Sequence, residues 1–318
     1  MVWRWKRRDV GRPALLSWRR RGIRRRGQRP LRPRDPAVKL YTHISDRYAP
    51  FHVTVIAATA NEAAQVLDGL LHHDSALDIR EHRTDAGGVS DHVFALMHLL
   101  GLRFLPRIPN LDDRRLYAFE PRSRYGVLGP LLSDRLDRGL IESHWDEVMR
   151  VITALRAGSV KAALIMTKLA AYPKQNGLAR ALREIGRIER TLAALDWIGD
   201  PDVPRETTEE LNKGESRNVL ARVVSFHRLG RFRDCGHESH CHRAAALNLV
   251  TAAIVLWNTR YLGRALDHLL QAGERFDEQL LRHLSPLGWE HINLTGDYVW
   301  SSDVIRGADG MRPLILSP

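Results

Sequence analysis

The stretch VKLYTHISDRYAPFHVTVIAAT, residues 38–59, contains two β-strand patterns separated by a turn. In residues 38–45 apolar side chains alternate with polar ones, which is the pattern of a strand. Residues 51–59 are also rich in the β-branched and aromatic residues that favour strands. Asp46 and Pro50 bound the intervening segment and are typical turn formers. We therefore expect two neighbouring strands joined by a short turn.

The following segments alternate between helix and strand patterns. Residues 61–73 have helical spacing and begin with an asparagine that can cap a helix. Residues 77–84 and 103–108 predict two further strands, and between them Ser90 caps a helix over residues 92–100. Strands that alternate with helices over short connections indicate an α/β sheet.

Beyond Leu111 apolar residues recur at helical spacing, and no fixed-period repeat is present. The expected helices cover residues 143–157, 158–171, 176–197, 211–229, 244–270 and 275–283. The sequence thus predicts a sheet, then an all-helical stretch, then a helical C-terminal part.

Composition excludes several classes of protein. The chain has 318 residues, 44% of them hydrophobic and 27% charged, which is typical of a globular protein with a sizeable core. Its two cysteines, Cys235 and Cys241, argue against a disulfide scaffold and favour a reducing compartment. The longest apolar run, residues 244–257, is too short to span a bilayer, and no secretory signal is visible. We expect a cytoplasmic protein without a membrane partner.

The net charge of +12 comes from one end of the chain. Residues 1–39 hold 15 of the 49 Lys and Arg residues and two of the 37 acids, so the remainder is almost neutral. A nucleic acid could be bound there only by a local basic patch. Candidate phosphate contacts, for each of which a solvated surface charge is the alternative, are Arg103, Arg107, Arg114, Arg115 and Arg217.

Residues 1–37 show no helical or strand periodicity and are dense in Arg, Pro, Gly and Trp. One interpretation is a basic arm that grips phosphates. A second is a mitochondrial-type presequence, although Trp3, Trp5 and Trp18 count against it. A third is a GC-rich gene read out of frame, since GC-rich codons give these residue types. We favour the third and expect this segment to be disordered.

Two acidic residues are candidates for chemistry. Asp85 directly follows residues 77–84 and precedes Ala-Gly-Gly, so an ordinary turn is its simplest interpretation. Glu215 lies one turn before Val219 on an expected helix, so its carboxylate should point towards the buried edge. There it would need an arginine, a cap or a metal as partner. The alternative is a first-turn glutamate favoured by the helix dipole.

If Asp85 and Glu215 converge, a divalent cation would relieve the repulsion between their carboxylates. Such metals can activate a water or a 3′-hydroxyl and stabilise the leaving oxygen in phosphoryl transfer. Gly87 and Gly88 would let a nucleic-acid backbone come close.

Several long stretches occur in the order of one protein family. They are residues 38–73, TDAGGVSDHVFALMHLLGLRFLPRIPNL (84–111), LNKGESRNVLARVV (211–224), LNLVTAAIVLWNTRYL (247–262) and HLSPLGWEHINLTGDYVW (283–300). Over about residues 38–313 the chain resembles the C-terminal catalytic part of the Tn-three family of replicative transposases. The resemblance implies an α/β fold with a ribonuclease-H-like core, as in DDE transposases and integrases, interrupted by an all-helical insertion. It also implies two aspartates and a glutamate that bind Mg²⁺, with Mn²⁺ able to substitute.

The resemblance assigns Asp85 as the second catalytic aspartate and metal ligand, and Glu215 as the catalytic glutamate and metal ligand. The implied division of the chain is an atypical segment 1–37, a ribonuclease-H-like sheet 38–120, a helical insertion 121–206, and a glutamate-bearing helix with the helical C-terminal part 207–318.

The family's first aspartate lies in a Ser-Ser-Asp-Gly context, on a strand before Tyr-Thr-His, and this chain lacks that motif. A frameshifted or 5′-truncated gene is the simplest account, and the long N-terminal DNA-binding half is also absent. Asp46 is a poor substitute because it falls in a turn, and Asp9 and Asp35 have no strand context. A lost first strand should leave a central sheet edge exposed to aggregation.

The implied function is metal-dependent cleavage at the 3′ ends of a transposon and strand transfer into target DNA. The implied partners are terminal inverted repeats, target DNA, and a second copy in a homodimer or a mixed assembly with full-length transposase. The expected location is the bacterial cytoplasm, at the nucleoid. The alternative is a non-catalytic remnant that binds DNA or a partner.

Two further motifs carry side chains that could bind metal or support the site. The side chains of CGHESHCH that could bind a metal are Cys235, His237, His240, Cys241 and His242. Their spacing matches no standard zinc finger, because adjacent ligands cannot easily converge. Four residues of the C-terminal motif are expected to support the site by packing and hydrogen bonding: Trp289, His291, Asn293 and Asp297.

Overall fold

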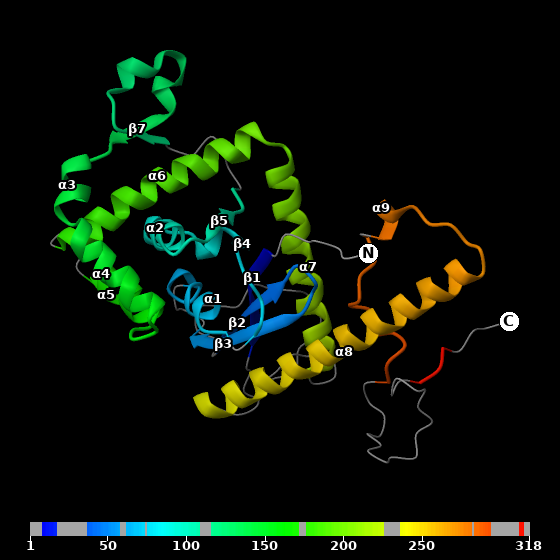
Figure 1. Ribbon diagram of the computed structural model, residues 1–318. Helices are drawn as coiled ribbons and strands as arrows, with labels where there is room; N and C mark the ends of the chain where they lie inside the picture. The colour runs from blue at the N-terminus through cyan, green and yellow to red at the C-terminus, as the bar shows by residue number, and fades with distance from the viewer. Residues whose placement is uncertain are drawn as a thin grey trace, which may run out of the picture.

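The computed structural model describes residues 8–17, 37–57, 62–73, 75–108, 116–171, 176–225, 236–281, 283–293 and 312–314, with backbone only for residues 8–17, 37, 38, 57, 64, 278 and 279. Its centre is a five-stranded sheet in the order β3-β2-β1-β4-β5 (Figure 1). The strands are β1 (Arg8–Ser17), β2 (Ala37–Ser45), β3 (Pro50–Ala57), β4 (Glu81–Thr84) and β5 (Arg103–Pro106). β1, β2 and β3 pair antiparallel, whereas β1, β4 and β5 pair parallel.

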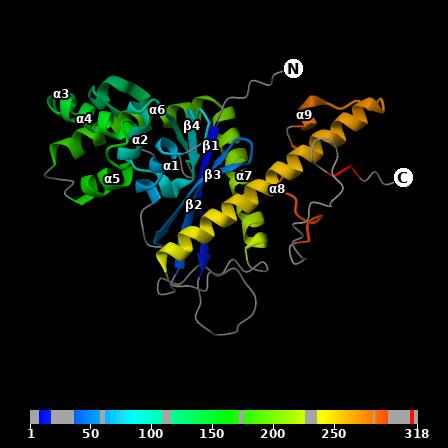
Figure 2. The same cartoon turned by 60° about the horizontal axis from the view of Figure 1, so that its bottom comes forward.

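Helices cover both faces of this sheet (Figures 1 and 2). Tyr41 and Ile56 pack into a core with α1 (Asp68–Leu71) and α2 (Asp91–Leu99). Leu40 packs on the opposite face, against Ala221 and Ala244. Successive residues of a strand point to opposite faces, so the neighbours Leu40 and Tyr41 each find a different helical layer. The predicted α/β architecture is confirmed.

The predicted strands are confirmed, although β4 and β5 are shorter than the segments 77–84 and 103–108 and β3 ends at Ala57. β2 and β3 match residues 38–45 and 51–59 closely, and Ser90 caps α2 by accepting a hydrogen bond from the main-chain nitrogen of Val93 at 3.2 Å. Of residues 77–84, only β4 pairs in the sheet.

The long helix predicted over residues 61–73 is wrong. The chain forms a short 3₁₀ turn, η1 (Glu62–Ala64), and then α1. The carboxylate of Asp68 accepts hydrogen bonds from the main-chain nitrogens of Ala162, at 2.6 Å, and Ala163. This segment therefore caps the start of α5 (Ala162–Ala171), a tertiary contact that helical spacing cannot reveal.

The part between the sheet and the last long helices is not entirely helical. It contains α3 (Arg138–Ser143), α4 (Trp145–Arg156), α5 and α6 (Gly177–Gly199). It also contains a parallel two-stranded sheet of β6 (Leu116–Ala118) and β7 (Leu132–Arg135), with the 3₁₀ segment η3 (Arg122–Leu131) between them. The expectation of an all-helical insertion over residues 121–206 is therefore wrong for β7, which is a strand within that range.

The C-terminal part consists of α7 (Asp202–Val224), α8 (His237–Gln271) and the short α9 (Glu278–Leu281). α7 begins before residue 211, so the predicted boundary after residue 206 falls inside a helix; the four-part division is otherwise untested. α8 extends well past the sheet (Figure 1). Among the described helices none is both long enough and apolar enough to cross a membrane.

The N-terminal segment contributes the central strand. β1 lies between β2 and β4, although residues 1–37 show no strand periodicity. Backbone groups of β2 and β4 need partners, and any extended segment can supply them whatever its side-chain pattern. The predictions of a segment without regular structure and of an exposed central edge are therefore wrong for residues 8–17.

Candidate active site

Asp85 lies at the C-terminal end of β4, where the chain turns into the 3₁₀ segment η2 (Ala86–Gly88). Its backbone is extended, and its Oδ1 accepts a hydrogen bond from the main-chain nitrogen of Gly87 at 3.0 Å. The half-buried side chain thus has the role of a turn cap with one carboxylate oxygen. Its other oxygen makes no hydrogen bond or ion pair among the described residues and can accept a ligand.

The two glycines after Asp85 are required by packing. A Cβ on Gly88 would lie 2.9 Å from Oγ1 of Thr84, and one on Gly87 would lie 3.0 Å from Oε2 of Glu62. The same position beside Gly87 is 3.3 Å from Oδ1 of Asp85, so a second carboxylate lies near the first. Glu62 is held by Lys39 at 2.7 Å, in a mostly buried ion pair. These contacts explain the glycines without a nucleic acid.

Glu215 lies on the exposed side of α7. The residues that face the sheet include Leu211, Gly214 and Asn218, whereas Val219 is 37% exposed. The derivation that placed the Glu215 carboxylate at the buried edge next to Val219 is therefore wrong. Buried polar side chains determine which face of α7 packs on the sheet. The apolar residues of the helix alone do not predict that face.

An arginine joins β4 to the first turns of α7. Arg83 is 1% exposed, and its guanidinium donates to Oγ1 of Thr207 at 2.8 Å and to the carboxylate of Glu206 at 2.9 Å. It also lies 3.4 Å from the main-chain oxygen of Val203. The strand that ends at Asp85 is thereby fixed to the helix that carries Glu215.

A lysine joins the next turn of α7 to the β2–β3 turn. The ammonium of Lys213 lies 2.8 Å from Glu210 and donates to the main-chain oxygen of Asp46 at 3.2 Å. It also lies 5.3 Å from the ring centre of Tyr48, a residue held at a left-handed φ of 65°. Burial raises the pKa of Glu210, although the nearby Lys213 lowers it.

A buried arginine holds α7 against β2 and α8. Arg217 is 2% exposed, and it donates to Oδ1 of Asn248 at 2.7 Å and lies 3.5 Å from Oγ1 of Thr42. Burial lowers its pKa to about 10. The suggestion that Arg217 contacts DNA phosphates is wrong, because the side chain is not accessible.

Asp46 and Asp85 lie at opposite ends of the strands in the sheet. β2 runs antiparallel to β1, and β1 runs parallel to β4, so the C-terminal end of β2 lies beside the start of β4. Asp46 follows that end, whereas Asp85 follows the other end of β4. The structure thus supports the rejection of Asp46 as a third ligand.

Asp9 does have a strand context, contrary to expectation, because it belongs to β1. It pairs with His82, three residues before Asp85, which is roughly 10 Å along the strand at about 3.3 Å per residue. The last recorded pair, Gly11 with Thr84, makes Arg12 the β1 residue level with Asp85. Asp35 lies outside the described residues.

The chemistry of Asp85 and Glu215 suits a hard divalent cation. Mg²⁺ prefers oxygen ligands and is commonly held by one or two carboxylates together with waters and phosphates. Within the described ranges, however, no cluster of three or more His, Cys, Asp or Glu side chains could hold a metal ion. α7 packs on β4, but no recorded contact joins Asp85 to Glu215, so their convergence stays a prediction.

The CGHESHCH motif lies at the start of α8. His237 and Cys241 are one turn apart, with Nε2 3.6 Å from Sγ, and His240 is buried. His242 lies on the same helix, and Cys235 falls outside the described residues.

The C-terminal motif supports α8. Nε2 of His291 lies 2.9 Å from Oδ1 of Asn258, whose amide donates to the main-chain oxygens of Pro286 and Gly288. Trp289 packs on the adjoining apolar cluster. Asn293 is exposed, and Asp297 lies outside the described residues.

The remaining basic candidates differ in availability. Arg103 is paired with Asp196 at 2.8 Å and lies 3.5 Å from Glu81, and these two carboxylates raise its pKa against the opposing effect of burial. The side chain of Arg107 is exposed, and its main-chain nitrogen donates to Thr84, so it lies at the Asp85 edge. Arg114 and Arg115 are outside the described residues.

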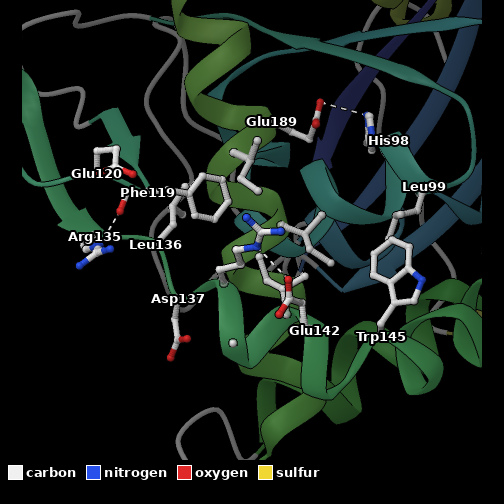
Figure 3. A pocket seen from close by; sticks show the side chains of 15 residues that line it. His98, Leu99, Phe119, Glu120, Arg135, Leu136, Asp137, Glu142, Trp145 and Glu189 are labelled. Carbon is white, nitrogen blue, oxygen red and sulfur yellow. Dashed lines mark hydrogen bonds and ion pairs between the residues drawn. The ribbon is translucent and has the colours of Figure 1, made fainter. Parts of the chain in front are cut away.

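A cavity of about 1060 Å³ lies elsewhere, between α2, α3, α6 and the β6–β7 region (Figure 3). Two pairs of its polar side chains contact each other: His98 lies 3.1 Å from Glu189, and Arg138 lies 2.8 Å from Glu142. Neither Asp85 nor Glu215 lines it. The cavity is therefore separate from the candidate site.

Sequence reasoning missed the side chains that position the site. Arg83, Glu206, Glu210 and Lys213 are charged residues in strand or helix segments, and each appeared to be an ordinary surface charge. The one available signal was a charged residue within a short buried strand, Arg83, because such a charge needs a partner.

Comparison with known proteins agrees with the resemblance. The profile of the family described as "Tn3 transposase DDE domain" matches residues 24–298. The chain is 53% identical to the transposase for transposon Tn2501 of Escherichia coli over 281 residues, and 54% identical over 281 residues to that for Tn501 of Pseudomonas aeruginosa. It is 36% identical to the transposase for transposon gamma-delta of Escherichia coli over 269 residues. These alignments cover 88%, 88% and 84% of this chain but only 28%, 28% and 27% of the relatives.

Proposed function

Because the chain belongs to the Tn3 transposase DDE domain family, we propose that its α/β body is the catalytic domain of a DNA transposase. The reaction is metal-dependent cleavage at the 3′ ends of a transposon followed by strand transfer into target DNA. Its partners are the terminal inverted repeats and the target DNA, bound by a homodimer or by a mixed assembly with full-length transposase at the bacterial nucleoid.

The single observation that carries this proposal is the position of Asp85 at the end of β4, on a strand fixed to the helix that bears Glu215. The strand order β3-β2-β1-β4-β5, with one antiparallel and one parallel half, supports a ribonuclease-H-like core. Catalytic acids at strand ends and on a covering helix can be held rigidly, which phosphoryl transfer requires.

In this proposal Asp85 and Glu215 hold Mg²⁺, for which Mn²⁺ can substitute. The bound ion would supply Lewis acidity and neutralise charge on the phosphate oxygens. The chain itself contributes positioning: the nitrogen of Gly87 fixes one oxygen of Asp85, and Arg83 holds β4 against α7. The exposed Arg107 at the same edge would bind a DNA phosphate.

We further propose that this copy is catalytically incomplete. Arg12 stands level with Asp85 on β1, and Asp9, which also lies on β1, is further along the strand. With two carboxylates, the domain would bind the metal weakly and cut slowly. The second candidate function is a non-catalytic remnant that binds DNA or full-length transposase, and Arg12 is the observation that favours it.

Two measurements test the proposal together. Electron paramagnetic resonance measures Mn²⁺ binding, and a cleavage assay measures Mg²⁺-dependent nicking of transposon-end duplexes. Asp85→Asn and Glu215→Gln should each weaken Mn²⁺ binding, while Glu209→Gln, an exposed acid on the same helix, should not. Unchanged Mn²⁺ binding in both site variants would contradict the metal site. Normal binding with no nicking by the intact chain would favour the remnant.

A further inference from the structure

An arm projects from the body after β6 (Figure 1). We define the arm as residues 119–135, which consist mainly of η3 and the returning strand β7. Its tip exposes apolar side chains: Val127 is 95% exposed, Leu128 54% and Leu131 46%. Large apolar side chains displayed together on a projection usually mark a binding surface.

The shape of the tip is specified by its glycines. Gly126 has a φ of 51°, which L side chains rarely adopt, and it makes a kink within η3 just before Val127. A Cβ on the buried Gly129 would lie 2.9 Å from the main-chain oxygen of Arg122, so the two sides of the tip pack closely. The exposed apolar residues are thus presented by a defined turn.

Arginines flank the apolar tip. Nε of Arg122 donates to the main-chain oxygen of Ser133 at 3.0 Å, and Nε of Arg135 donates to that of Phe119 (Figure 3). In the part of the chain that the structure describes, the terminal nitrogens of both guanidinium groups and the whole group of Arg124 have no partner. Residues 121–133 contain no acid, and the two acids of the arm, Glu120 and Asp134, lie next to its two ends. Held by Nε, a guanidinium keeps its other donors directed outwards for a phosphate.

The arm starts beside the candidate site. The main-chain nitrogen of Arg107, which follows β5, donates to the oxygen of Thr84 at 2.8 Å. Ile108 then packs with Leu116 and Leu132 at the base of the arm. The base of the arm therefore packs on the residue that follows the C-terminal end of β5, beside the strand end that precedes Asp85.

We propose that the tip of the arm is a wedge that unstacks base pairs of the duplex DNA whose phosphodiester is held at the C-terminal end of β4. Val127 and Leu128 enter the base stack, and Arg122 and Arg124 bind the flanking phosphates. Apolar side chains combined with arginine are the usual means by which proteins part a base step. This inference rests on the proposed function of the domain.

A second copy of the chain is the less suitable occupant. Specific protein interfaces bury roughly 800 Å² on each partner and place charged residues at their rim. A tip of three apolar side chains, flanked by guanidinium groups whose terminal nitrogens have no partner among the described residues, is small for that purpose. The combination of a narrow apolar point and outward-facing cations instead complements stacked bases between two phosphates.

The test uses the full chain and a nicked duplex with 2-aminopurine beside the nick, in the absence of divalent metal. The fluorescence of this base rises when it is unstacked. Wild-type protein should raise it, and the double variant Val127→Ser, Leu128→Ser should lose the rise. Leu164→Ser, an exposed leucine of α5, is the matched control and should retain it. The conservative double variant Val127→Leu, Leu128→Met should also retain it.

Affinity for the same duplex is measured in parallel against salt concentration. The double variant Arg122→Ala, Arg124→Ala should lower the slope of log affinity against log salt by about two, one for each lost phosphate contact. Arg150→Ala, Arg180→Ala removes equal charge from exposed helical positions and should change it less.

The outcomes separate the two proposals. If the tip variant binds the duplex and raises the 2-aminopurine fluorescence as much as the wild type does, the wedge is overturned. The catalytic proposal is unaffected by that result. Loss of self-association in the tip variant, with the signal unchanged, identifies a protein-binding surface and also overturns the wedge. A tip-dependent signal together with unchanged Mn²⁺ binding in the Asp85 and Glu215 variants supports the wedge and contradicts the metal site. Failure of the wild-type chain to bind the duplex overturns the wedge.

Discussion

The guanidinium of Arg83 lies 2.9 Å from the carboxylate of Glu206, across 123 residues of sequence. Arg83 is two residues before Asp85 on β4, and Glu206 is on the same helix as Glu215. This contact, together with the hydrogen bond to Thr207, fixes the relative position of the two elements that carry the proposed ligands.

Arg83→Ala should lower the free energy of unfolding by roughly 3 kcal/mol, because it removes one partner from a buried ion pair and several hydrogen bonds. Arg80 offers a matched control, since it also lies 2.9 Å from a carboxylate, Asp78, but on the surface. Arg80→Ala should cost less than about 1 kcal/mol. Urea denaturation measures both, and equal losses would contradict the anchoring role of Arg83.

The stability of the chain should respond to pH through Glu210. Burial raises the pKa of this group above its ordinary value of 4.5, so the folded state holds the proton more tightly than the unfolded state. The cost of ionising the buried carboxylate is absent below pH 4.5 and grows as the pH rises through the folded pKa. The free energy of unfolding of the wild type should therefore fall relative to Glu210→Gln between pH 4.5 and pH 7.

Denaturation of the two proteins at stepped pH provides that comparison. Glu209→Gln, on the exposed side of α7, should give a curve parallel to the wild type. A wild type that gains stability over Glu210→Gln as the pH rises would show that the ion pair with Lys213 outweighs burial.

Two helical glycines should respond to alanine with opposite signs. A Cβ on Gly186 of α6 would overlap the main-chain oxygen of Asp91 at the start of α2, whereas one on Gly263 of α8 meets nothing within 4 Å. Gly263→Ala should stabilise the chain by about 0.5–1 kcal/mol through helix propensity. Gly186→Ala should instead lower the unfolding temperature by several degrees, because α2 and α6 must separate. Thermal unfolding followed by circular dichroism distinguishes the two, and stabilisation by both would contradict the close packing of α2 on α6.

An acid placed on β1 should strengthen the proposed metal site. Arg12→Asp introduces a carboxylate level with Asp85 and should tighten Mn²⁺ binding by an order of magnitude or more. Asp9→Asn, further along the strand, should leave Mn²⁺ binding unchanged. If both variants bind Mn²⁺ as the wild type does, β1 does not border the site.

The elements that the sequence predicts well are those in which local pattern and tertiary packing agree. β2 alternates between two buried faces, and Ser90 caps α2 with a hydrogen bond inside its own first turn. Both features depend on neighbours in sequence. The position of Asp85 at a strand end follows from the same local pattern.

The rotation of α7 could not be predicted, because it depends on partners far away in sequence. Arg217 and Asn218 are polar yet buried, and an apolar stripe drawn through Val219 therefore pointed the wrong way. The short helix α1 was overestimated for a related reason, since Asp68 caps α5 and does not extend a helix of its own.

β1 also has a consequence for synthesis of the chain. It pairs with β2, which follows directly, and with β4, whose residues are translated much later. The central strand therefore leaves the ribosome early and has only one neighbour until residues 81–84 emerge. During that interval the unmatched side of β1 is open to pairing with another molecule, and slower elongation would prolong the exposure.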